Sequence, residues 1–222
     1  MEPTLTIGDY IVVNKIYYGS RLLKIRKLFN EKKIEYIRSK GISKITRGDV
    51  FVFNWPDYNS LNNPQPNMFG ACVVKRCYGI PGDNVVIRLK DARDEDMKSR
   101  LFPHDSTLHW TVSNYGPLFV PGKGKTILLN PKNAFHYKDI LHYEGYITNI
   151  KNDSVFLNNK YYFNYTFTHN YYFMKGDNFY GSEDSRYWGF VPEENIIGKV
   201  GFVLFSHDED GFKWNRFFKR IH

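Results

Sequence analysis

The 222-residue chain lacks the features that would place it in several common protein classes. Its two cysteines are too few for a disulfide framework and do not have the spacing of a metal site. Its seven histidines form no HExxH motif, and no paired CxxC occurs, so we expect no metal ion. No apolar run approaches the 18 residues that a membrane-spanning helix needs, and no signal peptide is visible at the start. These absences exclude a disulfide-stabilised module, a metal-dependent fold and a transmembrane helix within residues 1–222.

The two cysteines, Cys72 and Cys77, lie five residues apart in an apolar stretch that predicts one strand. An odd separation along a strand places the two side chains on opposite faces, so we expect no disulfide bond between them. Free cysteine behaves as a small apolar residue, and we expect both side chains to be buried.

Positive charge is concentrated in one segment. The formal net charge is +8, from 31 Lys and Arg against 23 Asp and Glu. Residues 20–47 hold ten of those cations and two of the acids, which leaves 21 of each in the rest of the chain. A local basic segment favours contact with anionic lipid or a partner over a nucleic-acid-binding fold. The alternative is a solvated, variable insertion, and the sequence leaves both open.

The sequence pattern predicts a mostly β protein. Its 17 Tyr and 18 Phe favour strands, and its charged fraction of 24% is typical of a globular chain. Residues 91–170 differ in character from the flanking parts and predict an inserted, smaller β-rich subdomain. Periodicity and turn residues predict strands over 9–14, 50–53, 71–78, 85–89, 171–174 and 201–206, turns at 47–49 and 81–83, a hairpin over 155–163, a short amphipathic helix within 20–40 and a short helix over 91–100.

Lys75 is the unusual residue of the strand ACVVKRCYGI. Such a lysine either extends its amine to water, which is the common outcome, or is buried with a lowered pKa and then can act as a general base. A later segment, Gly176 to Gly189, is dense in turn formers and hydrogen-bonding groups. There Ser182 could hold an amine in place, and Asp184 and Arg186 could form a charge-assisted pair, although a polar turn before a strand is equally compatible with those residues.

Four blocks of the chain, in this order and spacing, resemble the bacterial type I signal peptidase family. Residues Met1 to Leu5 match the family motif Ser-Met-x-Pro-Thr-Leu at every position after its serine. Residues 47–53, 75–83 and 176–189 resemble the three later blocks, and residues 201–221 are similar to members from Bacteroides-like bacteria. The resemblance covers about 1–90 and 171–222 and weakens between them. Co-occurrence of four blocks is specific, because chance matches to single motifs rarely combine in order.

The resemblance implies an antiparallel β-sheet catalytic domain over 1–90 and 171–222, with the basic insertion at 20–47 and the inserted subdomain at 91–170. It implies a Ser/Lys endopeptidase that needs no cofactor and cleaves signal peptides after small residues of the Ala-x-Ala type. The implied partners are signal peptides of preproteins and the membrane lipid surface, not nucleic acid. The implied location is the bacterial cytoplasmic (inner) membrane, with the catalytic domain on its outer, periplasmic face. The residues carried over are Lys75 as general base, Ser182 to orient its amine, Asp184 with Arg186 to brace the site, and Met1, Leu5, Val73 and Val74 to line the shallow substrate pockets.

The family's nucleophilic serine would stand directly before Met1, with a transmembrane anchor further upstream, and neither lies within residues 1–222. We expect the chain to be a truncated form of an active enzyme, and the 222-residue polypeptide to lack peptidase activity. One alternative is a nucleophile-less homologue that binds signal peptides without cleaving them. Another is the use of Ser182 or Ser185 as nucleophile, which the supporting position of Ser182 disfavours. A self-cleaving repressor-like Ser/Lys protease is disfavoured by the insertion at 91–170.

Overall fold

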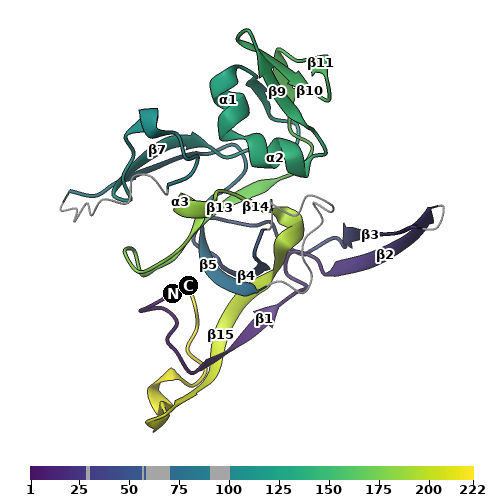
Figure 1. Ribbon diagram of the computed structural model, residues 1–222. Helices are drawn as coiled ribbons and strands as arrows, with labels where there is room; N and C mark the ends of the chain where they lie inside the picture. The colour runs from purple at the N-terminus through teal and green to yellow at the C-terminus, as the bar shows by residue number, and fades with distance from the viewer. Residues whose placement is uncertain (29–30, 57, 59–70, 91–100) are drawn as a thin grey trace.

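The computed structural model describes residues 1–28, 31–56, 58, 71–90 and 101–222. In these residues, strands predominate over helices, and the strand pairs are antiparallel, which confirms the predicted mostly β class. The main sheet has the strand order β1-β15-β4-β5-β13-β14, with β16 paired to β15 (Figure 1). Its strands are β1 (Asp9–Asn14), β4 (Val50–Asn54), β5 (Cys72–Gly79), β13 (Tyr171–Lys175), β14 (Val191–Pro192), β15 (Ile196–Asp208) and β16 (Gly211–Phe212).

Smaller sheets and short helices surround the main sheet. No helix in the described ranges is long and apolar enough to cross a membrane. The paired strands are β2 (Arg21–Leu28) with β3 (Glu31–Arg38), β6 (Asn84–Arg88) with β7 (Asn114–Phe119), β8 (Thr126–Leu128) with β12 (Asn164–Thr166), and β10 (Ser154–Leu157) with both β9 (Thr148–Lys151) and β11 (Lys160–Tyr161). The helices are α1 (Pro131–His136), α2 (Lys138–Tyr143) and α3 (Ser185–Trp188), and the 3₁₀ turns are η2 (Ser106–Leu108), η3 (Glu193–Asn195) and η4 (Trp214–Arg216).

Strand β4 forms the centre of the main sheet, between β15 and β5. All five of its residues are buried, because each face of the sheet is covered by its own apolar cluster. Phe51 and Phe53 pack on one face with Met174, whereas Val50 and Val52 pack on the other. A strand buried on both faces carries a continuous apolar run instead of an alternating one. This central strand holds β5, and therefore Lys75, in a fixed register.

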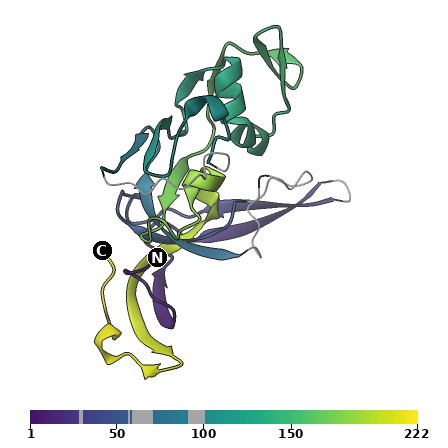
Figure 2. The same ribbon diagram turned by 60° about the vertical axis from the view of Figure 1, so that its left-hand side comes forward.

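The predicted helix within 20–40 is wrong: this segment forms the hairpin of β2 and β3, which projects from the body of the molecule (Figures 1 and 2). The register places Leu22 opposite Ile37 and Ile25 opposite Ile34. The helix prediction rested on Leu22, Ile25, Phe29 and Tyr36, but other apolar residues of the segment recur with a period of two, as at Leu23 and Ile25, and this period is that of a strand. Antiparallel pairing of the two runs places apolar positions opposite one another at three pairs, Leu22 with Ile37, Leu23 with Tyr36 and Ile25 with Ile34.

The middle third combines short strands with the two helices α1 and α2, which lie together with β9 to β11 at one end of the molecule (Figure 1). The predicted hairpin is confirmed in β10 and β11, where Asn158 and Asn159 adopt φ of 49° and 65° in the turn. The predicted helix over 91–100 lies outside the described residues. Strand β6 pairs with β7, so strand pairing continues across residue 90, and the domain boundaries stay a prediction.

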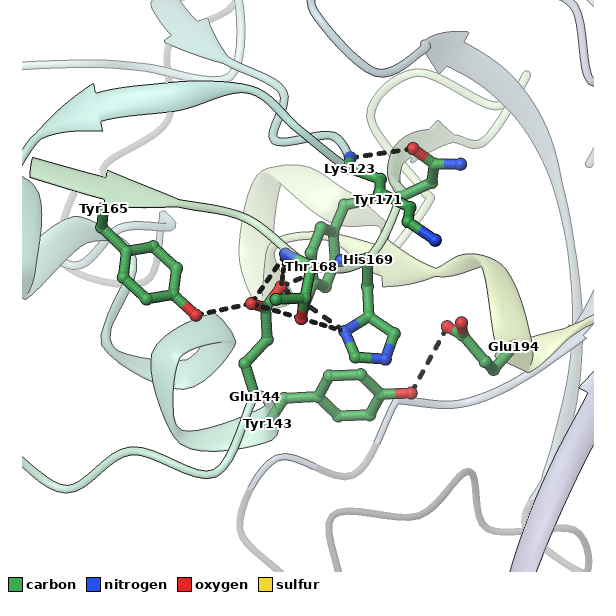
Figure 3. A network of polar contacts seen from close by, with 9 residues as sticks. Lys123, Tyr143, Glu144, Tyr165, Thr168, His169, Tyr171 and Glu194 are labelled. Carbon is green, nitrogen blue, oxygen red and sulfur yellow. Dashed lines mark hydrogen bonds and ion pairs between the residues drawn. The ribbon is translucent and has the colours of Figure 1, made fainter. Parts of the chain in front are cut away.

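A buried carboxylate, that of Glu144, ties the end of α2 to the start of β13 (Figure 3). Its side chain is fully buried and accepts hydrogen bonds from the Tyr171 hydroxyl at 2.9 Å, the Thr168 hydroxyl at 2.8 Å and the Tyr165 hydroxyl. Burial by itself disfavours ionisation, but the hydrogen bonds from His169, Tyr165 and Thr168 outweigh it and lower the pKa of Glu144 to about 2. The ionised carboxylate thereby anchors β13, the strand that leads into the site.

We predict that Glu144→Gln destabilises the fold at pH 7 by roughly 3 kcal/mol, which is the free energy that corresponds to a pKa lowered from 4.5 to about 2. A carboxylate with a depressed folded-state pKa stabilises the protein above its unfolded-state pKa and loses that contribution as the pH falls through the folded-state value. The difference in unfolding free energy between the two proteins should therefore shrink between pH 4.5 and pH 2, as measured by urea denaturation. The exposed Glu209→Gln is the matched control, and an equal effect of both changes would contradict the prediction.

Candidate active site

Lys75 and Ser182 meet although they are more than a hundred positions apart in sequence. The Nζ of Lys75, on β5, donates a hydrogen bond to the Oγ of Ser182 over 2.8 Å. Ser182 lies on the loop between β13 and α3, and it is buried. A Cβ at Gly176 would lie 1.9 Å from the Ser182 Oγ and 3.5 Å from the Lys75 Nζ. Only glycine fits at that position, because any side chain would displace the hydroxyl from the amine.

The Lys75 amine is partly buried, and its charge state follows from its surroundings. Burial lowers the pKa of Lys75 below its ordinary value of 10.5, and the charge of Arg186 acts in the same direction. The charges of Asp184 and Glu183 oppose this shift but do not overcome it. A lowered pKa increases the fraction of neutral amine at a given pH, and only the neutral amine can accept a proton.

Asp184 and Arg186 form a fully buried ion pair that shapes the loop around Ser182. The two oxygens of Asp184 accept from the Nε and Nη2 of Arg186, each at 2.8 Å. Asp184 is also the N-cap of α3 and accepts from the backbone N–H of Gly176. One carboxylate therefore joins the first residue of the loop to the helix that ends it, which fixes the loop at both ends.

Ser185, the other serine considered as a nucleophile, is fully buried, and its Oγ accepts a hydrogen bond from the backbone N–H of Met174 at 2.9 Å. It thus supplies an acceptor next to the irregular pairing of β13 with β5 between Phe173 and Met174. Its hydroxyl faces the strand backbone, and the hydroxyl of Ser182 faces Lys75.

A cavity of about 490 Å³ opens beside Lys75 and Ser182. Met1, Leu5, Val73 and Val74, the residues carried over as substrate-pocket positions, all line it. The amino group of Met1 lies close enough to Lys75 that burial and the lysine charge both lower the pKa of this amine. The structure thus brings the start of the chain, β5 and the loop after β13 together around one hollow.

The edge of β5 beside this cavity is open. Among the described strands, β13 pairs with β5 only at residues 76, 77 and 79, whereas β4 pairs along residues 72–76. The expectation that both cysteines are buried is wrong for Cys72, which lies on this open stretch, lines the cavity and is exposed. Cys77, further along the strand, is buried as expected, and both thiols are free.

Sequence analysis missed an ionic junction beside the cavity that joins the same three segments. The guanidinium of Arg76 binds both oxygens of Asp177 at 2.8 Å and reaches the Thr4 hydroxyl at 3.3 Å. The Thr4 hydroxyl in turn donates to Asp177. A cation directly after Lys75 and an acid directly after Gly176 were the available signals, since each lies inside a block that the sequence analysis had identified.

No group of three or more His, Cys, Asp or Glu side chains within the described ranges is placed to hold a metal ion. The chemistry available at the cavity is that of an amine with a lowered pKa, the hydroxyl beside it and the apolar walls.

Comparison with known proteins identifies the family of the chain. Signal peptidase I of Buchnera aphidicola subsp. Acyrthosiphon pisum is 30% identical over 235 residues, which covers 96% of this chain and 68% of that protein. The signal peptidases I of Haemophilus influenzae and Aquifex aeolicus are 27% and 28% identical, over 100% and 93% of this chain and 67% and 72% of their own lengths. The family model described as signal peptidase, peptidase S26, matches residues 1–205 and confirms the resemblance drawn from the sequence. The chain therefore belongs to the signal peptidase family, peptidase S26, whose members are serine-type hydrolases that cleave signal peptides.

Proposed function

We propose that Lys75 is the general base of a Ser/Lys peptidase whose nucleophilic serine occupies the position directly before Met1. The observation that carries this proposal is the hydrogen bond of 2.8 Å from the Lys75 Nζ to the Ser182 Oγ, in a cavity that Met1 also lines. A residue joined to the Met1 nitrogen would stand close to this amine, because the charge of Lys75 already acts on that nitrogen.

The reaction is an acyl transfer in two steps. Neutral Lys75 takes the proton of the serine hydroxyl as its oxygen attacks the scissile carbonyl carbon, and the lysine then gives that proton to the leaving amine. Neutral Lys75 then deprotonates a water that attacks the ester carbon of the acyl-enzyme; the bond from this carbon to the serine oxygen breaks, the serine oxygen takes the proton back from the lysine, and the new carboxylate is released. A neutral amine has one lone pair, so donating an N–H to Ser182 restricts the direction in which that lone pair points. Ser182 is thus a positioning residue, with Asp184 and Arg186 holding its loop.

The substrate is an extended peptide that adds a strand beside the open stretch of β5, where the backbone from residue 72 to 75 pairs on one side only among the described strands. Side chains of such a strand alternate in direction, so residues one and three positions before the scissile bond point to the same wall. Met1, Leu5 and Val74 pack on one face of β5 and make that wall apolar, and Val73 lines the cavity from the other face. A shallow apolar lining suits the small residues of an Ala-x-Ala sequence at the end of a signal peptide. Residues 1–90 and 171–222 form this catalytic domain, and residues 91–170 are inserted into it.

The protein acts at the outer face of the bacterial cytoplasmic membrane, where signal peptides of exported preproteins emerge. Strands β1, β15 and β16 lie together at one end of the molecule (Figure 1), and ring contacts join Tyr10 with Phe205 and Phe212 with Trp214 of η4. Trp214 is 75% exposed and Phe218 is 66% exposed, and Lys213 and Lys219 lie beside them in sequence. Aromatic rings with flanking cations are typical of residues that lie at a lipid–water interface. The basic segment 20–47 is a second candidate for anionic lipid.

The role of Lys75 is tested in the protein that carries a serine directly before Met1, with alanine at that place as the matched control. Lys75→Met should lower kcat/KM for a signal-peptide substrate by about 10²–10⁴-fold, the usual contribution of a general base. Lys75→Arg should not restore the rate, because guanidinium stays protonated. Lys75→Met activity within tenfold of the parent would refute the assignment.

The pH dependence follows from the lowered pKa of Lys75. The base acts in its neutral form, so the rate should rise as the pH increases through that pKa and level off above it. The midpoint should lie below 10.5, the ordinary value for lysine. Assays of kcat/KM across pH measure this midpoint, and circular dichroism at each pH monitors folding. A midpoint at or above the ordinary value for lysine would contradict the prediction.

Substrate preference tests the cavity wall. Val74→Ala should enlarge the pocket and raise the ratio of kcat/KM for a substrate with Leu before the scissile bond over one with Ala by about tenfold, as expected for removal of two methyl groups from a contact surface. Val86→Ala, at a 41% exposed position on β6 outside the cavity, is the matched control. An unchanged ratio in Val74→Ala would show that this wall does not contact the substrate residue.

Membrane contact is tested by flotation with vesicles of phosphatidylcholine and phosphatidylglycerol. Trp214→Ala with Phe218→Ala should lower partitioning about 30-fold, since each of the two aromatic anchors contributes on the order of 1 kcal/mol. Tyr161→Ala with Phe163→Ala, at exposed aromatic positions in the middle third, is the control. A third variant replaces the cations Lys24, Arg26, Lys27, Lys32 and Lys33 with Gln and should weaken binding only to anionic vesicles. If partitioning of either test variant is unchanged, the corresponding surface does not contact the membrane.

A further inference from the structure

Phe179 belongs to the loop that carries Ser182, and two cations lie over its ring. The Cζ of Arg186 is 4.4 Å from the centroid of its ring, and the Nζ of Lys175 is 5.1 Å from the same centroid. The Lys175 amine also lies 4.7 Å from the ring centroid of Tyr78. Cation–ring contacts therefore link Arg186, Phe179, Lys175 and Tyr78 in series, from α3 to β5.

One N–H group of the Arg186 guanidinium lacks a hydrogen-bond acceptor, and the Phe179 ring compensates for this in part. Arg186 is fully buried, and its Nε and Nη2 bind Asp184. Its Nη1 is buried too and has no hydrogen-bond partner within the described part of the chain. A buried N–H without an acceptor is unfavourable, whereas the negative face of an aromatic ring attracts a desolvated guanidinium. The ring of Phe179 thus supplies an attraction that no acceptor provides.

Arg186 holds residue 179 in two ways. Its Cζ lies over the ring, and its Nη2 donates to the backbone carbonyl of Phe179 at 2.6 Å. The turn continues with a hydrogen bond from the Gly181 N–H to the Asn178 side chain at 3.0 Å, and Ser182 follows directly. The position of the ring therefore fixes the start of the turn, and the turn fixes where the Ser182 hydroxyl points.

An aromatic ring is required here because two cations approach each other. Burial lowers the pKa of Lys175, and the charge of Arg186 lowers it further, which shows that the two positive groups repel. A ring beside both offsets this repulsion by its quadrupole, and an aliphatic side chain of similar size has no such field.

We propose that Phe179 is a positioning residue of the peptidase: its ring, held by Arg186 and Lys175, keeps the Ser182 hydroxyl within hydrogen-bonding distance of the Lys75 amine. This inference rests on the proposed role of Lys75 as general base. Phe179 itself does not line the cavity and does not touch the reacting atoms.

The test uses the protein with a serine directly before Met1 and replaces Phe179 with Leu, Tyr or 3,4,5-trifluorophenylalanine. Phe179→Leu should lower kcat about 10–100-fold, the size expected when a catalytic group is displaced by about an ångström, and leave KM within about twofold. The acid limb of the pH profile should move to higher pH, because a displaced Lys75 becomes more hydrated and regains a higher pKa. Phe179→Tyr keeps an aromatic ring and should therefore retain the parent kcat and the parent acid limb. The trifluorinated ring keeps the shape but weakens the quadrupole, so it should lower kcat and shift the limb in the same direction.

Two controls separate the possible failures. Phe163→Leu, at a position 63% exposed in the middle third, should leave kcat and the pH profile unchanged. If Lys75→Met retains activity, the proposed base is wrong and the positioning inference falls with it. If Lys75→Met is inactive but Phe179→Leu or the trifluorinated variant has the parent kcat and acid limb, only the inference on Phe179 is overturned. A lowered melting temperature with an unmoved acid limb would show a purely structural role and would also overturn it.

Discussion

The structure depends on one hydrogen bond between an amine and a hydroxyl that lie 107 residues apart in sequence, those of Lys75 and Ser182. The distance of 2.8 Å is ordinary, and what is unusual is the environment in which the amine is held. A partly buried lysine costs free energy to keep charged, so its neutral form becomes accessible and its lone pair available. Two conditions must hold together for this. The amine must be withdrawn from water, and a neighbouring group must hold it without adding a charge. A serine hydroxyl satisfies the second condition, whereas a carboxylate in its place would stabilise the ammonium.

The fold meets these conditions by fixing three segments from different directions. Central β4, covered on both faces, sets the register of β5. The Glu144 carboxylate anchors the start of β13 (Figure 3). The buried pair of Asp184 with Arg186 fixes the loop that follows. The junction of Arg76 and Asp177 joins that loop to β5 and, through Thr4, to the start of the chain. The position of the amine is thus set by contacts from several sides.

Sequence reasoning predicted those parts of the site that are encoded within single blocks. Asp184 and Arg186 are two positions apart, so the local pattern could suggest their pairing, whereas the roles of Lys75 and Ser182 were expected only from the family resemblance of their blocks. The link from Arg76 to Asp177 and Thr4 was missed because it joins three blocks, and its partners become neighbours only in the folded chain. The β2–β3 hairpin was mistaken for a helix because its apolar positions satisfy both periods, and the pairing of the two halves decides between them. Cys72 was expected to be buried because its strand is apolar, and it is exposed because β13 pairs only with the far half of β5.

The charges around Lys75 show how an amine can keep a lowered pKa close to acidic residues. The carboxylates whose charges raise its pKa are Asp184, Glu183 and Asp177, and unopposed they would favour the ammonium. Asp184 is bound by Arg186 and Asp177 by Arg76, so the field of each carboxylate at the amine is reduced by its own guanidinium. Glu183 is exposed, and solvent screens its charge. The arginines therefore perform an electrostatic task besides bracing the loop. Arg186 thereby allows the Asp184 carboxylate to accept hydrogen bonds from the backbone N–H groups of Gly176 and Arg186, while burial still lowers the pKa of the lysine.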